Sequence, residues 1–223
     1  MASWIKNEFW VGYNWFEKAF LWAMIALQVI VYCFVPDTPI GMICGIAGVI
    51  CVVLTAKGKI SSYIFNFIQM ITYMIICWEA ALFLEFGEQV FYFIACIFGV
   101  ITWKKNMHKT EDGAEEVTAK KLSVVGWVIV IAATTVGTYL FGLLGAAIGS
   151  TLSYLDAVTT VLAIVAQVLM VLRYREQWAA WIAIDVASLV LFIILGNWSM
   201  IAMYIAWTIN AFYGWYNWTK LNK

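Results

Sequence analysis

The sequence predicts an all-α integral membrane protein with eight transmembrane helices. They form two parallel three-helix repeats, joined by a linker helix and preceded by an extra N-terminal helix. Three observations support this fold class: the composition, a one-sided distribution of basic residues, and a similarity between the two halves. The 223 residues are 65% hydrophobic and 12% charged, whereas soluble domains are about 45–50% apolar and ~25% charged. The lipid bilayer is therefore an expected partner.

The elements follow one another with short connections. Residues 1–17 mix aromatic side chains with Lys6, Glu8 and Glu17, which is typical of an amphipathic segment at the membrane interface. The segment lacks the basic start and cleavage site of a signal peptide. Apolar stretches that approach the ~20 residues needed to cross a bilayer then cover residues 18–35, 39–56, 60–83, 89–105, 121–144, 153–172, 177–196 and 198–219. Pro36 and Pro39 mark the first turn between spans, and Gly196-Asn197 marks the last.

The basic residues predict the orientation. With a cytoplasmic N-terminus, eight spans place all thirteen Lys and Arg residues on the cytoplasmic side. The other side holds Asp37, Glu85, Glu88 and Asp156, with no Lys or Arg. Because cytoplasmic loops are enriched in Lys and Arg, both termini are expected in the cytoplasm. The polar connection from Lys104 to Lys121 mixes both charge signs and is expected to be a solvated linker.

The two halves align at an offset of about 115–116 residues. Lys57-Gly58-Lys59 matches Arg173-Tyr174-Arg175, and Gly99 and Trp103 match Gly214 and Trp218. A repeat of three spans needs one further span to restore its orientation, so the repeats are expected to be parallel. This arrangement resembles that of the SWEET sugar carriers, which bind substrate between the repeats.

The repeat divides the chain into segments. The extra helix occupies residues 18–35, and the first three-helix repeat occupies 39–105. A cytoplasmic loop and the linker helix fill 106–152, and the second repeat occupies 153–219.

The sequence lacks the residue patterns that several classes of function require. The five cysteines, at 33, 44, 51, 77 and 96, lie in apolar stretches without paired spacing, and His108 is the only histidine. These features disfavour a metal site, a catalytic triad and a membrane protease. Basic residues are too scattered for a nucleic-acid surface. We therefore expect no catalytic residue, no cofactor and no nucleic-acid partner, and a membrane enzyme is disfavoured.

Trp178, Trp181, Asp185 and Ser188 lie on one face of the predicted helix 177–196. A carboxylate within a span costs about 2.5–3.5 kcal/mol on insertion scales, so Asp185 is expected to face a cavity, a partner or a substrate. The two indoles favour a flat and cationic ligand.

Polar or aromatic stripes also follow three other predicted spans. They comprise Ser62, Asn66, Gln69 and Tyr73; Tyr92, Cys96, Gly99 and Trp103; and Trp207, Asn210, Gly214 and Asn217. A central substrate route needs such faces. The candidate substrate-binding residues are Trp181, Asp185, Asn210, Gln69, Asn66, Trp207, Tyr213, Phe65, Ser188 and Asn217.

Each stripe also has a structural interpretation. The amides can join helices by hydrogen bonds, and Asp185 can be a buried structural carboxylate. An aromatic belt at the membrane border is the default for Trp103, Trp178, Trp198, Trp215 and Trp218. Packing or pore lining is expected of Thr159, Thr160 and Gln167.

Two motifs carry a family resemblance. Trp178-x-x-Trp181-x-x-x-Asp185, preceded by Arg173-x-Arg175-Glu176, resembles the nicotinamide riboside transporter (PnuC) family, as does Asn210-x-x-Tyr213-Gly214-x-x-x-Trp218-Thr219. The resemblance covers the chain from about residue 39 onward. It implies an uptake carrier of the bacterial inner membrane that works by facilitated diffusion. It also implies a SWEET-like fold and a homo-oligomer, with trimers known in the family.

The residues suit the implied substrate. Nicotinamide riboside is a pyridinium cation with a ribose and a carboxamide. Trp181 and Trp207 can stack on the ring with cation–π attraction of about 0.5–2 kcal/mol, and Asp185 can accept from the ribose or offset the charge. Lys and Arg occur only at the ends of the spans and not in their interiors, so the phosphorylated mononucleotide is expected to be rejected. Thiamine or riboflavin, carried by relatives, and a sugar remain alternative substrates.

Overall fold

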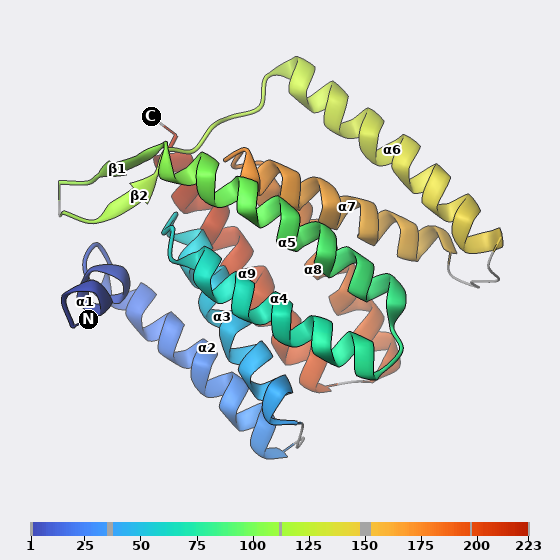
Figure 1. Cartoon of the computed structure of the whole chain (residues 1–223), viewed down its shortest axis with the longest axis horizontal. Coiled ribbons are helices and arrows are strands. Elements are labelled where there is room, and N and C mark those ends of the chain that lie inside the picture. Colours follow the sequence, from blue (N-terminus) through green and yellow to red (C-terminus); the bar gives the residue numbers. More distant parts are fainter. Residues whose placement is uncertain (1, 35–37, 112, 148–152, 197, 223) are drawn as a thin grey trace.

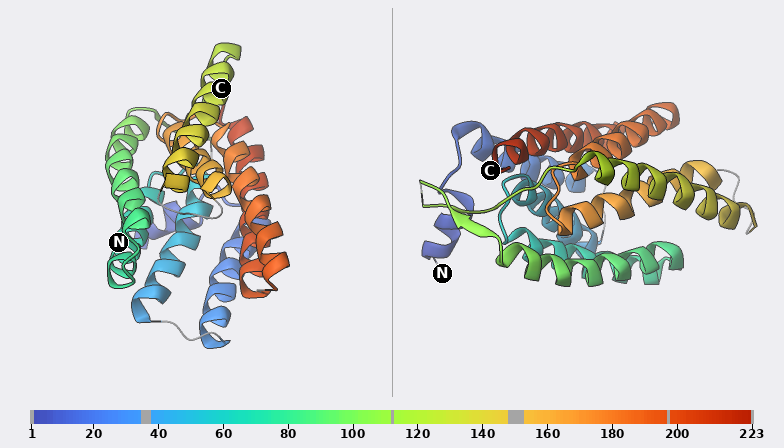
Figure 2. Two further views of the ribbon diagram at one scale, coloured as in Figure 1. Left: turned by 90° about the vertical axis from the view of Figure 1, so that its right-hand side faces the viewer. Right: turned by 90° about the horizontal axis from the view of Figure 1, so that it is seen from above.

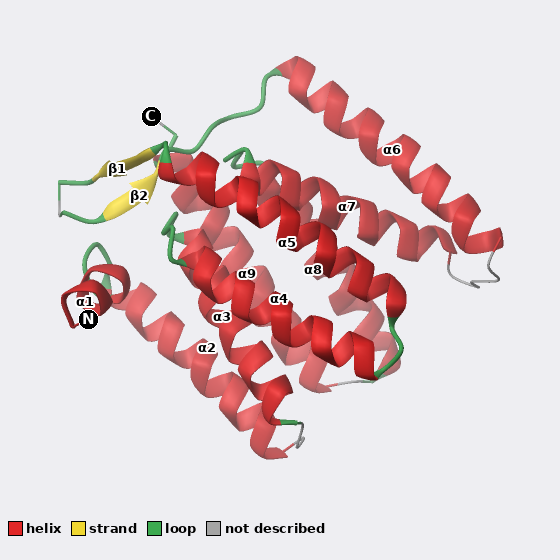
Figure 3. Cartoon of the chain, in the orientation of Figure 1, coloured by secondary structure: helices red, strands yellow, loops and turns green. Residues whose placement is uncertain are grey.

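The computed structural model describes residues 2–34, 38–111, 113–147, 153–196 and 198–222. This part of the chain is a helical bundle with one short hairpin (Figure 3). The helices are α1 (Ala2–Phe9), α2 (Trp15–Phe34), α3 (Pro39–Ala56), α4 (Ser62–Glu79), α5 (Phe83–Lys104), α6 (Val124–Ala147), α7 (Ser153–Val171), α8 (Gln177–Leu195) and α9 (Trp198–Lys220). The strands are β1 (Met107–Lys109) and β2 (Glu115–Val117).

Five helices in the described part of the chain are long and apolar enough to cross a membrane. They are α2, α3 and α6, together with Glu85–Lys104 of α5 and Gln177–Ile194 of α8. A shorter apolar stretch, Ala157–Val171, lies in α7. The protein is therefore a multi-pass, all-helical membrane protein. The polar stripes on α4 and α9 lower their hydropathy, and the count of eight spans stays a prediction.

Local residues explain several helix ends. The Thr38 side chain accepts a hydrogen bond from the Gly41 amide at 3.0 Å and caps α3, whose first residue is Pro39. α5 begins at Phe83, so the predicted start at residue 89 is wrong. Glu85 lies in the first turn of α5, where a carboxylate stabilises the positive end of the helix dipole. The predicted turn residues Pro36, Asp37 and Asn197 lie outside the described residues.

The helices pack in two sets. α3 packs on α4 and α4 on α5, while α7 packs on α8 and α8 on α9. The sets meet where α5 contacts α7 and where α3 contacts α9. α2 packs beside α3, whereas α6 contacts α7 and stands away from the rest of the bundle (Figures 1 and 2).

Two buried tryptophans join the sets of helices. Trp103 on α5 donates its indole N–H to the Met170 carbonyl of α7 at 2.9 Å. Trp218 on α9 donates to the Thr55 carbonyl of α3 at 2.9 Å. Both side chains are 0% exposed, and Trp178 is also buried. The aromatic-belt interpretation is therefore wrong for these three residues.

The segment Val117–Lys120 connects four helix ends. Its successive amides donate to the carbonyls of Gly58, Asn106, Leu221 and Arg173 at 2.7–3.0 Å. β1 and β2 form an antiparallel hairpin just before it, and both termini lie at the same end of the bundle (Figure 1). We call this the basal end.

The connection from Lys104 to Lys121 is thus more ordered than predicted. Ala114, Glu116, Val117 and Ala119 are buried. The expectation of a solvated linker is wrong for this stretch, because apolar side chains and backbone amides of the connection pack against the helix ends. Only part of the connection, such as Lys109 and Glu115, is exposed.

Candidate functional site

A cavity of about 320 Å³ lies between the two sets of helices. Its size falls at the lower end of the ~300–1,000 Å³ that small-molecule sites occupy. Residues from α3, α4, α5, α7, α8 and α9 line it, so no single helix forms the site. The lining residues are Gly48, Cys51, Val52, Thr55, Asn66, Gln69, Gln89, Tyr92, Gln167, Met170, Trp178, Trp181, Ile184, Asp185, Tyr204, Trp207, Asn210 and Ala211.

One part of the cavity is aromatic. Trp178 and Trp181 come from successive turns of α8, and Tyr204 and Trp207 come from successive turns of α9. The Tyr204 and Trp207 rings meet edge to face, with centroids 5.4 Å apart. Such surfaces bind flat ligands by stacking and attract cations through the negative faces of the rings.

Asp185 supplies the only formal charge among the described lining residues. Its side chain is 6% exposed, and no salt bridge reaches it within the described part of the chain. A buried carboxylate without a basic partner is unfavourable. The site is therefore suited electrostatically to a ligand that brings a positive charge.

The other polar groups are mainly carboxamides. Asn210 donates from Nδ2 to the Val52 carbonyl at 3.2 Å, while its Oδ1 atom is buried without a hydrogen-bond partner. Asn66 and Gln167 direct their amide nitrogens to Cys96 Sγ at 3.3 and 3.2 Å. The remaining amides are Gln69 and Gln89.

The structure brings six predicted site residues to this cavity: Asn66, Gln69, Trp181, Asp185, Trp207 and Asn210. Their contact with substrate stays a prediction. Four further candidates lie elsewhere: Phe65, Ser188, Tyr213 and Asn217.

Each of these four has a physical reason for its position. Phe65 precedes Asn66 by one residue, which turns it about 100° around the helix, and its ring contacts Phe9 of α1. Ser188 follows Asp185, where the cavity ends along α8. Tyr213 bonds Glu17, and Asn217 donates to the Ala56 carbonyl at 2.9 Å.

Several lining residues were absent from the predicted site. Gln89 was missed because residue 89 was taken as the first residue of a span. Tyr92 and Trp178 belonged to recognised stripes but were not chosen as site residues. Gln167 was interpreted only as packing or pore lining, and Tyr204 gave no signal in the sequence beyond its position one turn before Trp207.

Below the cavity, buried charges join the N-terminal segment to the bundle. Lys57 Nζ lies 3.1 Å from Glu17 and 3.9 Å from Glu116, and it donates to the Gly12 carbonyl at 2.9 Å. Burial raises the pKa of Tyr13 above its ordinary range. Burial also lowers the pKa of Lys59, although Glu116 opposes this shift. These residues close the basal end of the bundle.

An apolar helical bundle around an aromatic and amide-lined cavity is typical of a membrane protein with a small-molecule site. The chain belongs to the family described as nicotinamide mononucleotide transporter, whose profile matches residues 38–220. The resemblance to the PnuC family is confirmed. The chain is a multi-pass bacterial membrane protein of a transporter family and not an enzyme.

Similar proteins support this assignment over the full chain. The nicotinamide riboside transporter PnuC of Haemophilus influenzae is 41% identical, covering 100% of this chain and 98% of that protein. The same transporter of Neisseria mucosa is 38% identical, covering 99% and 87%. A crystal structure of the vitamin B3 transporter PnuC superposes with a TM-score of 0.84 at 36% identity, covering 99% of this chain and 97% of that one.

Proposed function

We propose that this chain transports nicotinamide riboside across the bacterial inner membrane. The relatives named above carry this substrate by name. The observation that carries the proposal is the composition of the cavity, where three indoles and one unpaired carboxylate lie beside five carboxamides. A pyridinium ring suits the indoles and Asp185, and the ribose and carboxamide suit the amides. Thiamine, riboflavin and sugars remain the alternatives.

The cavity also supports the riboside over the phosphorylated mononucleotide. None of the described lining residues is Lys or Arg, and phosphate recognition normally uses these residues. Asp185 would repel the phosphate charge. The family description mentions the mononucleotide, so this choice needs a direct measurement.

A binding panel tests the substrate. Purified full-length protein is titrated calorimetrically with nicotinamide riboside, nicotinamide mononucleotide, thiamine, riboflavin and glucose. We expect the riboside to bind at least about 100-fold more tightly than the mononucleotide, a difference of about 2.7 kcal/mol. Equal affinity for both would contradict the argument from charge, and preference for another vitamin or the sugar would reassign the substrate.

The proposed topology has eight spans, α2 to α9, with both termini in the cytoplasm. The basic turns that contain Gly58 and Arg173 both accept hydrogen bonds from the segment Val117–Lys120 at the end of the hairpin. This supports their placement on the same side of the membrane. Cysteine accessibility tests this: a cysteine placed at Lys109 is expected to react with a membrane-impermeant maleimide only in inverted vesicles. The native exposed Cys33 is first replaced by Ser.

We further propose that residues 39–105 and 153–219 are parallel repeats, as in SWEET carriers. Residues 1–17 are then the interfacial segment, 18–35 the extra helix, and 106–152 the cytoplasmic loop with its linker helix. Paired contacts support the repeat. The bond from Trp103 to Met170 and the bond from Trp218 to Thr55 have the same length, and both their donors and their acceptors are 115 residues apart in sequence. A ligand between the repeats would lie in the cavity.

Facilitated diffusion with alternating access is the proposed mechanism. The two sets of helices would tilt relative to each other at the contacts of α5 with α7 and of α3 with α9. This motion would expose the cavity to each side of the membrane in turn. Uptake into liposomes without any ion gradient is expected. Strict dependence on a proton or sodium gradient would instead assign a coupled carrier, in which Asp185 is the first group to examine.

A homo-oligomer, with a trimer as the proposed state, completes the assignment. α6 exposes large apolar residues such as Val124, Ile129 and Leu144 and packs only against α7 among the helix pairs with substantial contact. Mass measurement of the detergent-solubilised protein is expected to give a multiple of the 25.2 kDa chain mass. A monomer would contradict this part of the proposal.

A further inference from the structure

A buried thiol lies behind the amide part of the cavity. Cys96 on α5 is 0% exposed and is not among the lining residues. Its sulfur lies 3.3 Å from Asn66 Nδ2 of α4 and 3.2 Å from Gln167 Nε2 of α7. Both amides line the cavity. One side chain outside the site thus contacts two residues inside it, from both sets of helices.

The hydrogen-bonding capacity of the Cys96 thiol limits how the two amides can be oriented. A thiol has one hydrogen to donate and a weakly accepting sulfur. It can donate to only one amide oxygen, so at least one of the two amides must direct its N–H group to sulfur. In the structure both do so. An amide that turns its nitrogen toward Cys96 turns its oxygen away from Cys96, and this oxygen is then available to a ligand.

Asn210 of α9, which lines the same cavity, has a similar arrangement. Its nitrogen is occupied by the Val52 carbonyl, and its buried oxygen lacks a partner. Three amides from α4, α7 and α9 therefore present hydrogen-bond acceptors. A buried acceptor without a partner costs free energy, so a ligand that supplies donors is favoured over one that supplies acceptors.

We propose that Cys96 is a positioning residue for substrate selection, because it fixes Asn66 and Gln167 with their oxygens toward the ligand. The inference rests on the proposed transport of nicotinamide riboside, whose carboxamide N–H₂ and ribose hydroxyls are the donors that these oxygens accept. Nicotinic acid riboside replaces the carboxamide by a carboxylate, which has acceptors only. A riboside with methylated 2′ and 3′ hydroxyls loses the ribose donors.

The test compares the affinities of three ligands for the natural protein and for each variant. Affinities for the riboside and both analogues are measured by calorimetry for the natural protein, Cys96→Ala and Cys96→Ser. In Cys96→Ala the amides are free to rotate, so the preference for the riboside over at least one analogue is expected to fall about fivefold or more. Cys96→Ser supplies an oxygen that accepts both N–H groups, and the preference is expected to return.

Controls separate positioning from folding. Cys77→Ala removes another thiol that is 0% exposed but lies outside the cavity, and its ligand preferences should match those of the natural protein. Cys96→Val leaves no cavity and supplies no acceptor, although valine is slightly larger than cysteine, and it replaces Cys96→Ala if that variant does not fold. A folded Cys96→Ala or Cys96→Val protein with both preferences unchanged overturns the role of Cys96. Failure of the natural protein to bind the riboside overturns the proposed function instead.

Discussion

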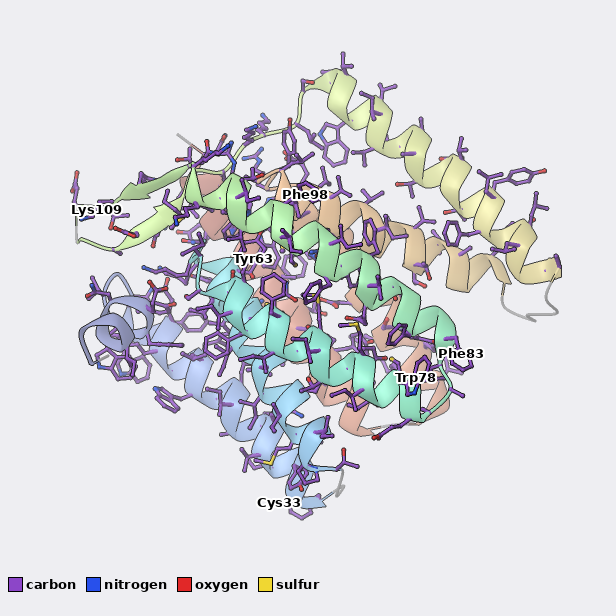
Figure 4. All side chains as sticks on the ribbon, viewed as in Figure 1. Cys33, Tyr63, Trp78, Phe83, Phe98 and Lys109 are labelled. Carbon is purple, nitrogen blue, oxygen red and sulfur yellow. The ribbon has the colours of Figure 1, made fainter. Side chains whose placement is uncertain are left out.

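Trp103 and Trp218 pack against each other with ring centroids 5.5 Å apart, although about 115 residues separate them in sequence. Each ring also meets an aromatic residue of the preceding helix. Tyr63, labelled in Figure 4, lies edge to face with Trp103 at 5.0 Å, and Trp178 lies edge to face with Trp218 at 6.1 Å. These contacts are paired in the way that the proposed repeat predicts.

Trp181→Ala is expected to weaken nicotinamide riboside binding about tenfold or more. Aromatic stacking on a base contributes about 1–3 kcal/mol, and 1.4 kcal/mol corresponds to a factor of ten. Calorimetry measures the loss. Trp78→Ala is the matched control, because Trp78 is 64% exposed beside Phe83 at the turn between α4 and α5 (Figure 4). Equal losses in both variants would argue against a site role for Trp181.

Asp185→Asn tests the charge of the site. The substitution retains shape but removes the negative charge, so affinity for the cationic riboside is expected to fall about tenfold, as for a lost charged interaction of about 1.5–3 kcal/mol. The reduced riboside, which has a neutral dihydropyridine ring, should lose much less. Glu79→Gln, at the exposed end of α4, is the control. A similar loss for both ligands would mean that Asp185 acts through shape or folding.

Two glycines form a matched pair for separating stability from binding. A Cβ atom at Gly214 would overlap the Trp178 ring, and one at Gly99 would overlap Tyr63. Both Gly→Ala substitutions are expected to cost about 1–3 kcal/mol of unfolding free energy by overpacking, seen as a lower Tm. Only Gly214→Ala should also weaken riboside binding, because Trp178 lines the cavity.

Gly87→Ala is the control for this pair, since a Cβ there meets nothing within 4 Å. It is expected to leave Tm unchanged or slightly higher, because alanine is favoured over glycine in a helix by about 0.5–1 kcal/mol. A large loss of stability at Gly87, or none at Gly99, would contradict the packing described here.

The buried ion pair of Glu17 and Lys57 is expected to be needed for folding of the basal end. Lys57→Met leaves Glu17 buried and unpaired, which costs about 3–5 kcal/mol, and thermal unfolding should show a clearly lower Tm. The double variant with Glu17→Gln should recover part of the loss. Lys109→Ala removes an exposed pair with Glu115, where the lysine side chain is 75% exposed, and should cost at most about 1 kcal/mol.

The helical spacing of polar residues predicted much of the cavity. Asn66 with Gln69, and Trp181 with Asp185, share faces of α4 and α8, and the cost of a charge within the membrane indicated Asp185 as a site residue. Periodicity assigns a face but not the length of helix that a cavity occupies. It therefore could not separate Asp185, at the cavity, from Ser188, which lies beyond it.

The predictions for the tryptophans and the hairpin of the basal end were wrong for a different reason. Trp103 and Trp218 were expected at a lipid border because each lies near the end of a span. Residues distant in sequence, including Val117 and Met170, cover them in the folded chain. No local sequence pattern predicts that distant residues cover a side chain. The mixed charges of the hairpin suggested that it is exposed to solvent, although Glu116 is buried beside Lys57. Gln167 was interpreted as packing or pore lining and was not chosen as a site residue, because one amide on an apolar helix forms no stripe.

The hydrogen bond from Ala119 to Leu221 also orders events in time. Ribosomes make the chain from its N-terminus, so this bond and that from Trp218 to Thr55 must wait until residues 218–221 have been synthesised. These two contacts of the basal end consequently form only after α9 has been synthesised, whereas the pairing of Lys57 with Glu17 needs only the first part of the chain. A chain that stops before Leu221 leaves the Ala119 amide without this acceptor and is therefore expected to be less stable.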